Sequence, residues 1–331
     1  MRAERMKIVV TGGAGFIGAN LCRTLVERGV ERIVVIDDLS TGSKHNVNDL
    51  PVDLRVGSVL DAELLRACLG GAHSVVHLAA RPSVPLSLND PAATDTVNST
   101  GTLRVLEAAR RESTHVVIAS SSAVYGANSE LPLREETTPM PLSPYAASKL
   151  AAESYAAAYA HSFDLPTLVF RFFNVFGPLQ PPDHAYAAAI PAFLSAALAG
   201  RSLAVHGDGG QTRDFIYVGS VARALADAAM RQLTRVRPVN LACGTRTSLS
   251  ELINVISQLV DRPIKVQQAT ERLGDIRDSQ ADISQLRDLL PTLRPVDISV
   301  GLRKTIQWMK TSDGRIAVPA MAGHQYAIMN D

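Results

Sequence analysis

The stretch at residues 7–38 limits the possible folds of this chain more than any other. It begins with an apolar strand from Ile8 and continues through a glycine-rich turn at residues 11–18 and a helix to about Arg28. A second apolar strand follows at residues 33–36. Strand, glycine turn, helix and strand make a βαβ unit, in which glycines let a pyrophosphate approach the N–H groups at the helix N-terminus. The stretch therefore predicts a dinucleotide-binding site.

The acid that follows this unit indicates which dinucleotide binds. Gly12, Gly15 and Gly18 recur at every third residue, and Asp37 ends the second strand with Asp38 directly after it. A carboxylate at that point accepts hydrogen bonds from the adenosine ribose diol and repels a 2′-phosphate. We therefore predict NAD rather than NADP.

The composition excludes two classes of partner. The chain has 331 residues, of which 46% are hydrophobic and 20% charged, and 33 Lys+Arg balance 32 Asp+Glu to a net charge of +1. Because no dense basic block is present, the sequence predicts neither a nucleic-acid partner nor an anionic membrane surface. The longest apolar run, residues 185–200, is too short for a spanning helix.

The cysteines and the first residues bear on the compartment. Cys22, Cys68 and Cys243 lie far apart without CxxC spacing, so we expect neither a disulfide framework nor a metal site. The charged first residues run directly into the first strand, and we expect no signal peptide. Together these features predict a cytoplasmic protein.

Short apolar runs alternate with helical segments along the first half of the chain. We expect strands at residues 54–56, 74–78, 115–120 and 167–172, and helices at residues 61–69, 91–111 and 145–163. This alternation predicts an α/β fold with a doubly wound parallel Rossmann sheet, whose ligands bind beyond the carboxyl ends of the strands.

The second half of the chain changes character after residue 178. We assign residues 1–178 to the dinucleotide-binding domain and expect residues 214–245 to rejoin it, through a helix at 218–230 and a strand at 238–242. Residues 179–213 and 246–312 are then a smaller, interleaved C-terminal substrate lobe. The tail at residues 313–331 shows no periodicity, and its role is unknown.

Tyr145 and Lys149 are the strongest candidates for chemistry. Residues four apart share one face of a helix, so the phenol and the ammonium point into one site. A free tyrosine has a pKa of about 10, and a neighbouring ammonium together with a positive nicotinamide ring favours the phenolate, which makes a general base. Ser121, on the turn after the strand at residues 115–120, would relay the proton or bond to the reacting hydroxyl, and Ser120 or Ser122 could take the same role.

Several motifs beyond these residues carry a family resemblance. TGGAGFIG, HLAA, SSSAVYG, YAASK, RFFNVFGP, TRDFIYV and GDIRDSQAD occur in this order. The chain thereby resembles the extended short-chain dehydrogenase/reductases, within them the NAD-dependent nucleotide-sugar epimerase/dehydratase family, and most closely the UDP-hexose 4-epimerases. The resemblance implies an isomerase with tightly bound NAD, a UDP-sugar substrate and a transient 4-keto sugar. It also implies a homodimer in which the helices at 91–111 and 145–163 form a four-helix interface.

The resemblance further implies roles for individual residues. The cofactor-binding set is Gly12, Gly15, Phe16, Ile17, Gly18, Asp37, Asp38, Ser58, Val59, Leu78, Ala79, Ala80, Arg81, Asn98, Ser120, Tyr145 and Lys149. The substrate-binding set is Ser121, Ser122, Tyr145, Asn174, Ala188, Val205, Arg213, Arg272 and Asp275, with Arg277 as a competitor for the role of Arg272. Ser58 departs from the aspartate that many relatives carry there.

Two acidic side chains that other members of the family use are missing here, and this limits the reactions to be expected. The resemblance places Ser122 and Ala123 where sugar-dehydrating and decarboxylating relatives carry acids, and neither side chain does acid–base work near neutral pH. Inversion at C4 needs only the tyrosine, lysine and serine. The sequence therefore favours a 4-epimerase of the UDP-glucose/UDP-galactose type. UDP-glucuronate and UDP-N-acetylhexosamine remain alternatives, the latter because Ser279 is small. A nucleotide-sugar reductase and a non-catalytic NAD-binding sensor are the other readings.

Overall fold

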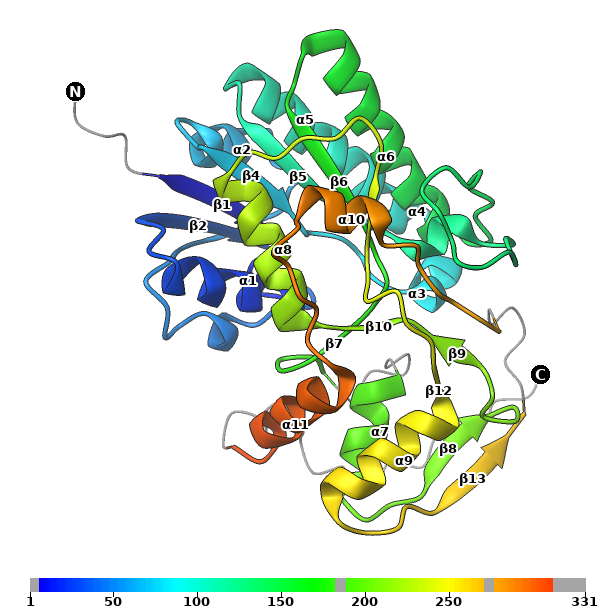
Figure 1. Cartoon of the computed structure of the whole chain (residues 1–331). Coiled ribbons are helices and arrows are strands. Elements are labelled where there is room, and N and C mark those ends of the chain that lie inside the picture. Colours follow the sequence, from blue (N-terminus) through cyan, green and yellow to red (C-terminus); the bar gives the residue numbers. More distant parts are fainter. Residues whose placement is uncertain (1–5, 182–188, 271–276, 312–331) are drawn as a thin grey trace.

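A computed structural model of the chain describes residues 6–181, 189–270 and 277–311 (Figure 1). Its centre is a sheet of seven parallel strands. In spatial order these are β11 (Val239–Leu241), β6 (Thr167–Phe172), β5 (His115–Ser121), β4 (Ser74–His77), β1 (Lys7–Thr11), β2 (Arg32–Asp37) and β3 (Asp53–Val56). The predicted doubly wound parallel fold is confirmed.

The strands are short, and each lies between two layers of helices that cover the faces of the sheet. Ile8 and Val10 of β1 face one apolar cluster, while Val9 between them faces another. A strand buried on both faces needs apolar residues throughout, and residues 8–10 are all apolar. The strand order reverses between β1 and β4, and a crevice for ligands forms at such a reversal, beyond the carboxyl ends of the strands.

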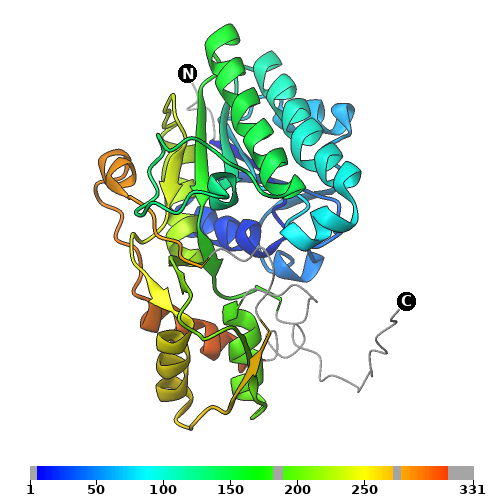
Figure 2. The same cartoon turned by 90° about the vertical axis from the view of Figure 1, so that its right-hand side faces the viewer.

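Helices cover both faces of this sheet (Figure 2). One face carries α1 (Phe16–Glu27) and α8 (Val218–Met230), which pack against each other. The other carries α2 (Ala62–Leu69), α5 (Gly101–Arg111) and α6 (Pro144–Phe163). We call the sheet with these helices the Rossmann half.

The helix expected over residues 91–111 is interrupted. It begins as α4 (Pro91–Asp95), widens to a π-helical turn, η2 (Thr96–Thr100), and continues as α5. A π turn inserts a residue into the helical register and frequently marks a functional position. Here the turn carries Asn98 against α6.

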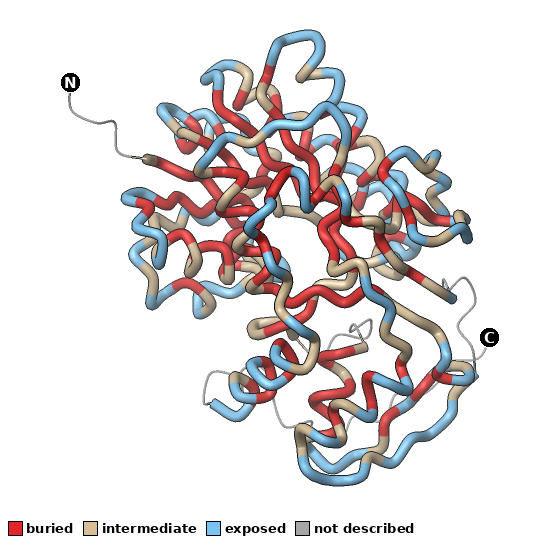
Figure 3. Tube along the Cα trace, in the orientation of Figure 1, coloured by how far each residue is buried: buried red, intermediate tan, exposed pale blue. Residues whose placement is uncertain are grey.

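The remaining segments form a smaller lobe with its own core, below the sheet in Figure 1. Its elements are α7 (Ala189–Leu198), β8 (Leu203–His206), β9 (Thr212–Arg213), β12 (Thr247–Ser248), α9 (Leu249–Val260), β13 (Val266–Ala269) and α11 (Ile298–Met309). Figure 3 shows buried chain in both parts, with exposed loops between elements.

The two parts are joined by short elements. β7 (Asn174–Phe176) and β10 (Phe215–Tyr217) pair in parallel beneath the carboxyl edge of the large sheet. β11 returns to the large sheet beside β6. The other short elements are η1 (Lys44–Asn46), α3 (Val84–Asn89), η3 (Ser122–Tyr125) and α10 (Ser284–Leu289).

Candidate active site

The glycine turn between β1 and α1 forms a cradle that no other residue type would fit. Gly12 has φ +70°, and a Cβ there would lie 2.7 Å from the Ala79 nitrogen. A Cβ on Gly18 would lie 2.2 Å from the Gly12 carbonyl oxygen. Gly15 caps α1 without any side-chain hydrogen bond, so no cap side chain occupies the first N–H groups of the helix, which is where an anion binds.

Two further observations test whether these residues fit NAD. Arg81, on the loop after β4, has a buried Nε without a hydrogen-bond partner among the described residues, so it lacks an acceptor that a ligand would supply. Asp37 ends β2 beside the glycine turn and accepts hydrogen bonds from the backbone nitrogens of Ala14 (2.9 Å) and Leu39 (2.8 Å). Its oxygens have further acceptor capacity for a ribose diol. The cradle, the cation and the acid fit the predicted dinucleotide.

Burial and hydrogen bonding act on the Asp37 carboxyl in opposite directions. Burial raises its pKa, while the backbone N–H groups of Leu39 and Ala14 counteract part of that rise. Asp38, by contrast, accepts hydrogen bonds from Ser40 at an exposed position. The carboxylate aimed at the glycine turn is therefore that of Asp37.

The other predicted cofactor residues lie around the same edge of the sheet. Phe16 and Ile17 open α1 and reach the lobe core, and Leu78, Ala79 and Ala80 follow β4. Ser58 accepts a hydrogen bond from the Leu60 nitrogen, and Val59 is buried. Their contacts with NAD stay predictions.

A chain of hydrogen bonds crosses beneath the cradle through His77. Its Nδ1 lies 2.7 Å from the Thr11 hydroxyl and its Nε2 lies 3.0 Å from the Thr102 hydroxyl. The Thr102 proton goes to the Asn98 carbonyl, so His77 must donate through Nε2 and accept through Nδ1. Burial, with the charge of Lys149, lowers the His77 pKa to about 3. The imidazole is a neutral structural group.

Asn98 links the cofactor loop to the helix that carries Tyr145. Its Oδ1 accepts a hydrogen bond from the backbone nitrogen of Arg81 at 2.8 Å, and its Nδ2 donates one to the Ser148 hydroxyl at 3.0 Å. Ser148 in turn donates to the Tyr145 carbonyl oxygen at 2.8 Å. The π turn therefore fixes the start of α6 relative to the loop after β4.

Tyr145, Lys149 and Ser121, the three predicted catalytic residues, lie close together. Ser143 caps α6, so the phenol and the ammonium lie in its first two turns, with Lys149 Nζ 6.0 Å from the centre of the Tyr145 ring. Desolvation raises the Tyr145 pKa, and a hydrogen bond from the Ser121 hydroxyl lowers it in part. The Lys149 pKa falls to about 8 because burial disfavours its charge, although Glu153 counteracts this.

Lys149 Nζ lies over the Tyr145 ring and donates a hydrogen bond to the Ala119 carbonyl oxygen at 2.9 Å. Burial is the larger influence on the Tyr145 phenol and raises its pKa, while the hydrogen bond from Ser121 lowers it. The expected stabilisation of the phenolate by Lys149 and the nicotinamide ring stays a prediction.

The sequence reading missed a buried ion pair directly behind Lys149. Glu153 on α6 binds Arg171 on β6 through two hydrogen bonds, and Ser120 donates to the same carboxylate. Two signals were present: Glu153 continues the four-residue spacing from Tyr145 and Lys149, and Arg171 interrupts an apolar strand. Ser120 thus has a partner on α6, and its predicted contact with the cofactor stays a prediction.

The predicted substrate residues lie at the junction with the lobe. Asn174 donates to the Asp214 carbonyl oxygen at 3.2 Å, and Val205 is buried in β8. Arg213 donates to the carbonyl oxygens of Thr212 (2.9 Å) and Arg277 (3.1 Å). Ser122 begins the turn η3. Ala188, Arg272 and Asp275 lie outside the described residues.

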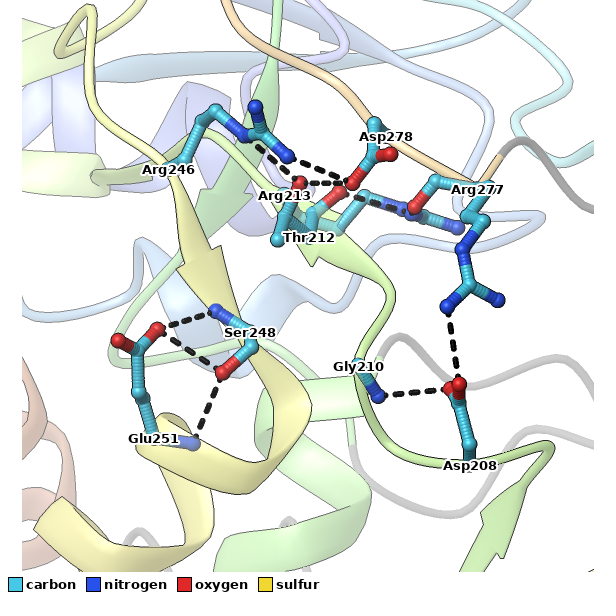
Figure 4. A network of polar contacts seen from close by, with 9 residues as sticks. All are labelled: Asp208, Gly210, Thr212, Arg213, Arg246, Ser248, Glu251, Arg277 and Asp278. Atoms are coloured by element: carbon cyan, nitrogen blue, oxygen red, sulfur yellow. Dashed lines mark hydrogen bonds and ion pairs between the residues drawn. The ribbon is translucent and has the colours of Figure 1, made fainter.

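A polar network orders the segment around Arg213 (Figure 4). Arg246 and Thr212 both bind the Asp278 carboxylate, and Arg277 binds Asp208 at 2.9 Å. Ser248 and Glu251 cap α9 reciprocally beside this network. The network joins three chain segments next to the predicted diphosphate-binding arginine.

Asp214, directly after Arg213, is a second residue that the sequence reading missed. Its fully buried carboxylate accepts hydrogen bonds from the backbone nitrogens of Cys243 and Gly244 (both 2.9 Å) and Ala281 (3.2 Å). Burial raises its pKa to about 6 despite these N–H groups. The side chain therefore holds the loop after β11 against the start of β10.

Two other features are absent from the described residues. No helix in the described part of the chain is both long and apolar enough to cross a bilayer. Among the same residues, no group of three His, Cys, Asp or Glu side chains is arranged to hold a metal ion.

The fold and the glycine cradle together define a class: proteins with a parallel α/β sheet that bind a dinucleotide cofactor at its carboxyl edge. Comparison with known proteins narrows this class, because a sequence model of the NAD dependent epimerase/dehydratase family matches residues 8–242. The chain belongs to this family. The predictions of the family and of NAD as cofactor are confirmed.

Individual relatives are similar over nearly their whole length. A UDP-glucose 4-epimerase of Mycolicibacterium smegmatis is 36% identical over 312 residues, which cover 92% of this chain and 99% of the relative. The solved UDP-N-acetylglucosamine 4-epimerase of Methanobrevibacter ruminantium is also 36% identical, with a TM-score of 0.87 over 92% of this chain and 98% of its own. The NAD complex of the Thermus thermophilus UDP-glucose 4-epimerase is 34% identical, with a TM-score of 0.84 over 93% and 100%.

Proposed function

We propose that this protein is an NAD-dependent UDP-sugar 4-epimerase that inverts C4 through a transient 4-keto sugar. The observation that carries the proposal is the placement of Tyr145, bonded by Ser121 and backed by Lys149, at the sheet edge that also holds the glycine cradle. The names of the similar proteins support the same activity.

The residues of the chain divide the proton chemistry between them. The Tyr145 phenolate removes the proton of the 4-hydroxyl, and Ser121 donates a hydrogen bond that stabilises charge on the phenol or on the sugar oxygen. Lys149 would hold a hydroxyl of the nicotinamide ribose, and its Nζ lies 6.0 Å from the centre of the Tyr145 ring. When bound, NAD⁺ would supply the hydride acceptor and a second positive charge.

The residues after β5 favour epimerisation over the other reactions of the family. Ser122 and Ala123 form the turn η3, and neither carries a group that moves protons at C5 or C6. Dehydration and decarboxylation need such a group. A non-catalytic NAD sensor has no supporting observation, because the tyrosine, lysine and serine are all in place. A reductase would use the same three residues, and it differs from an epimerase in releasing its nicotinamide cofactor readily.

For the sugar, we propose the neutral hexoses UDP-glucose and UDP-galactose. UDP-N-acetylhexosamine is the second candidate, because Ser279 is small and its backbone nitrogen is fixed to the Thr212 carbonyl oxygen next to Arg213. A side chain as small as serine at this position would admit a C2 substituent. UDP-glucuronate is the third, since Asn174 and the serines at 121 and 122 offer hydrogen-bond donors to a carboxylate.

We further propose a homodimer and a reducing compartment. Apolar side chains on the outer surfaces of α3 and α6 stand partly in solvent, with exposed fractions of 62% for Leu88, 38% for Tyr155 and 50% for Phe163. Packing α5 and α6 against a second copy would cover part of this area. All three cysteines are free, as a cytoplasmic protein would have them.

The test is a panel of nucleotide sugars with a matched inactive variant. Purified protein is incubated separately with UDP-glucose, UDP-N-acetylglucosamine and UDP-glucuronate, and the C4 epimers are separated by chromatography. We expect conversion of at least one sugar by the wild type and none by Tyr145→Phe within the same time. Conversion of no sugar by a wild-type protein that carries NAD would overturn the proposal.

A further inference from the structure

Three residues of α6 lie on one stripe of the helix that faces the sheet. Tyr145, Lys149 and Glu153 are spaced by four residues, so they stack on successive turns. The first two belong to the proton-transfer site described above. Glu153 is buried, with 6% of its side chain exposed, one turn further from the substrate.

These three side chains meet three consecutive residues of β5. The Ala119 carbonyl oxygen accepts a hydrogen bond from Lys149 Nζ at 2.9 Å. The Ser120 hydroxyl donates to Glu153, and the Ser121 hydroxyl bonds to the phenol of Tyr145. Successive side chains of a strand point to opposite faces, so the orientation of the Ser121 side chain depends on the position of its neighbour Ser120. The contact between Ser120 and Glu153 sets that position.

The negative charge of Glu153 is itself held in place by Arg171. The guanidinium donates from Nε to Oε1 at 3.0 Å and from Nη2 to Oε2 at 2.8 Å, which is a forked, charge-assisted arrangement. Arg171 lies directly opposite Ser120 in the sheet register and stacks over the Tyr125 ring at 4.7 Å. The guanidinium therefore keeps the carboxylate ionised and in one orientation.

We propose that Glu153 is a positioning residue of the proton-transfer site. Its carboxylate fixes the carboxyl end of β5 against α6, and its charge keeps Lys149 protonated. Arg171 completes the arrangement. The inference rests on the proposed function, because only that function requires Ser121 and a charged Lys149 to face Tyr145 together.

The charges around Lys149 agree with this role. Tyr145 and Glu153 face it from α6 and His77 faces it from β4, while Arg171 stands on β6 behind Glu153. Burial lowers the Lys149 pKa, and Glu153 is the group that raises it again. His77 is neutral and adds no positive charge. Loss of the Glu153 charge should therefore leave Lys149 deprotonated at a lower pH.

The first experiment measures the Lys149 pKa directly. The chain has only six lysines, so ¹³Cε-lysine labelling gives a small number of NMR signals, and Lys149→Met identifies the one required. The double variant Glu153→Gln/Arg171→Met removes both buried charges with nearly the same volume. We expect the Lys149 pKa to fall by about one unit or more relative to wild type. Asp53→Asn, which breaks an exposed ion pair with Arg55 on the edge strand β3, should leave it unchanged.

The second experiment follows turnover and separates position from charge. Glu153→Asp keeps the charge but shortens its reach, and Ser120→Ala keeps the ion pair but removes the link to β5. Both should lower kcat by about 10-fold or more, because a displacement of about 1 Å at the reacting groups has effects of this size. Neither should move the Lys149 pKa by more than about 0.5 units, since the charge stays in place. KM for the UDP-sugar should stay within about twofold, because neither residue belongs to the predicted substrate-binding set and the Ser120 hydroxyl is bonded to Glu153.

Failure of this inference can be distinguished from failure of the proposed function. An unchanged Lys149 pKa in the double variant would overturn the electrostatic role, whether or not any sugar is epimerised. Wild-type kcat in both Glu153→Asp and Ser120→Ala would overturn the positioning role, and these two variants decide it even if the double variant fails to fold. Failure of the wild type to convert any UDP-sugar would instead overturn the proposed function.

Discussion

Glu153 and Arg171 of the Rossmann half form an ion pair with 6% and 4% of their side chains exposed, whereas Asp208 and Arg277 of the lobe form one with 59% and 62% exposed. The buried pair has no water to replace a lost partner, so its geometry is fixed and its charge acts strongly on neighbours. The exposed pair is screened and can exchange its partners.

This difference suggests a division of work between the two halves. Tyr145 and Lys149, which the proposed reaction requires in a fixed orientation and charge state, lie among buried charges in the Rossmann half. Arg213, proposed to bind the diphosphate, lies beside the exposed ion pairs of the lobe. Substitutions in the first region should act on kcat and stability, and substitutions in the second on KM.

The largest expected effect is on turnover through Tyr145. Tyr145→Phe keeps the ring and removes the group that transfers the proton, so kcat should fall by about 10²-fold to 10⁴-fold with KM nearly unchanged. Steady-state kinetics with the best substrate of the panel measure both. A variant with wild-type kcat would remove the basis for assigning the chemistry to the Rossmann half.

The next effect is on stability and compares the two ion pairs. Arg171→Ala leaves Glu153 buried without its partner, and we expect a loss of about 3–5 kcal/mol in the free energy of unfolding. Arg277→Ala in the lobe should change the unfolding midpoint far less, and any change should shrink as salt is added. Urea unfolding of both variants at low and high salt measures these changes in stability. Equal losses in the two variants would contradict the comparison.

A third prediction concerns binding by the lobe. Arg213→Ala removes a side chain proposed to form charge-assisted hydrogen bonds with the diphosphate, so KM should rise by about 10-fold to 100-fold while kcat changes little. Arg246→Ala is the matched control, because it removes a neighbouring guanidinium that is already bound to Asp278. A drop in kcat with unchanged KM would place Arg213 in the chemistry instead.

The smallest expected effect is the pH dependence contributed by His77. Its folded-state pKa is about 3, below the ordinary 6.5, so between these values the unfolded chain binds more protons than the folded one. Stability is therefore lost as the pH falls from about 6.5 toward 3, by at most about 1.4 kcal/mol per unit. NMR of the imidazole nitrogens should show the neutral Nε2–H form at pH 5. A protonated His77 at that pH would contradict the account.

Most of the Rossmann half could be predicted because its signals are local. The glycine turn, the apolar strands and the spacing of Tyr145 and Lys149 each lie within a few turns of chain. Their chemistry also dictates the residue type, as the contact of a Gly18 Cβ with the Gly12 carbonyl oxygen shows. Local pattern and global fold agree at these positions.

The features that could not be predicted depend on contacts between distant segments. Ser120 meets Arg171 only through the register of β5 and β6, and Asp214 binds backbone nitrogens about 30 and 67 residues away. The register of two parallel strands cannot be predicted from the sequence of either strand alone.

The central claim is that the hydride leaving C4 of the sugar returns to the same carbon. The most direct test uses the preferred UDP-sugar carrying deuterium at C4, incubated with the holoenzyme in ordinary water until the epimers equilibrate. The account predicts that both epimers retain the deuterium at C4, as mass spectrometry and NMR would show. Loss of the label to solvent would contradict it.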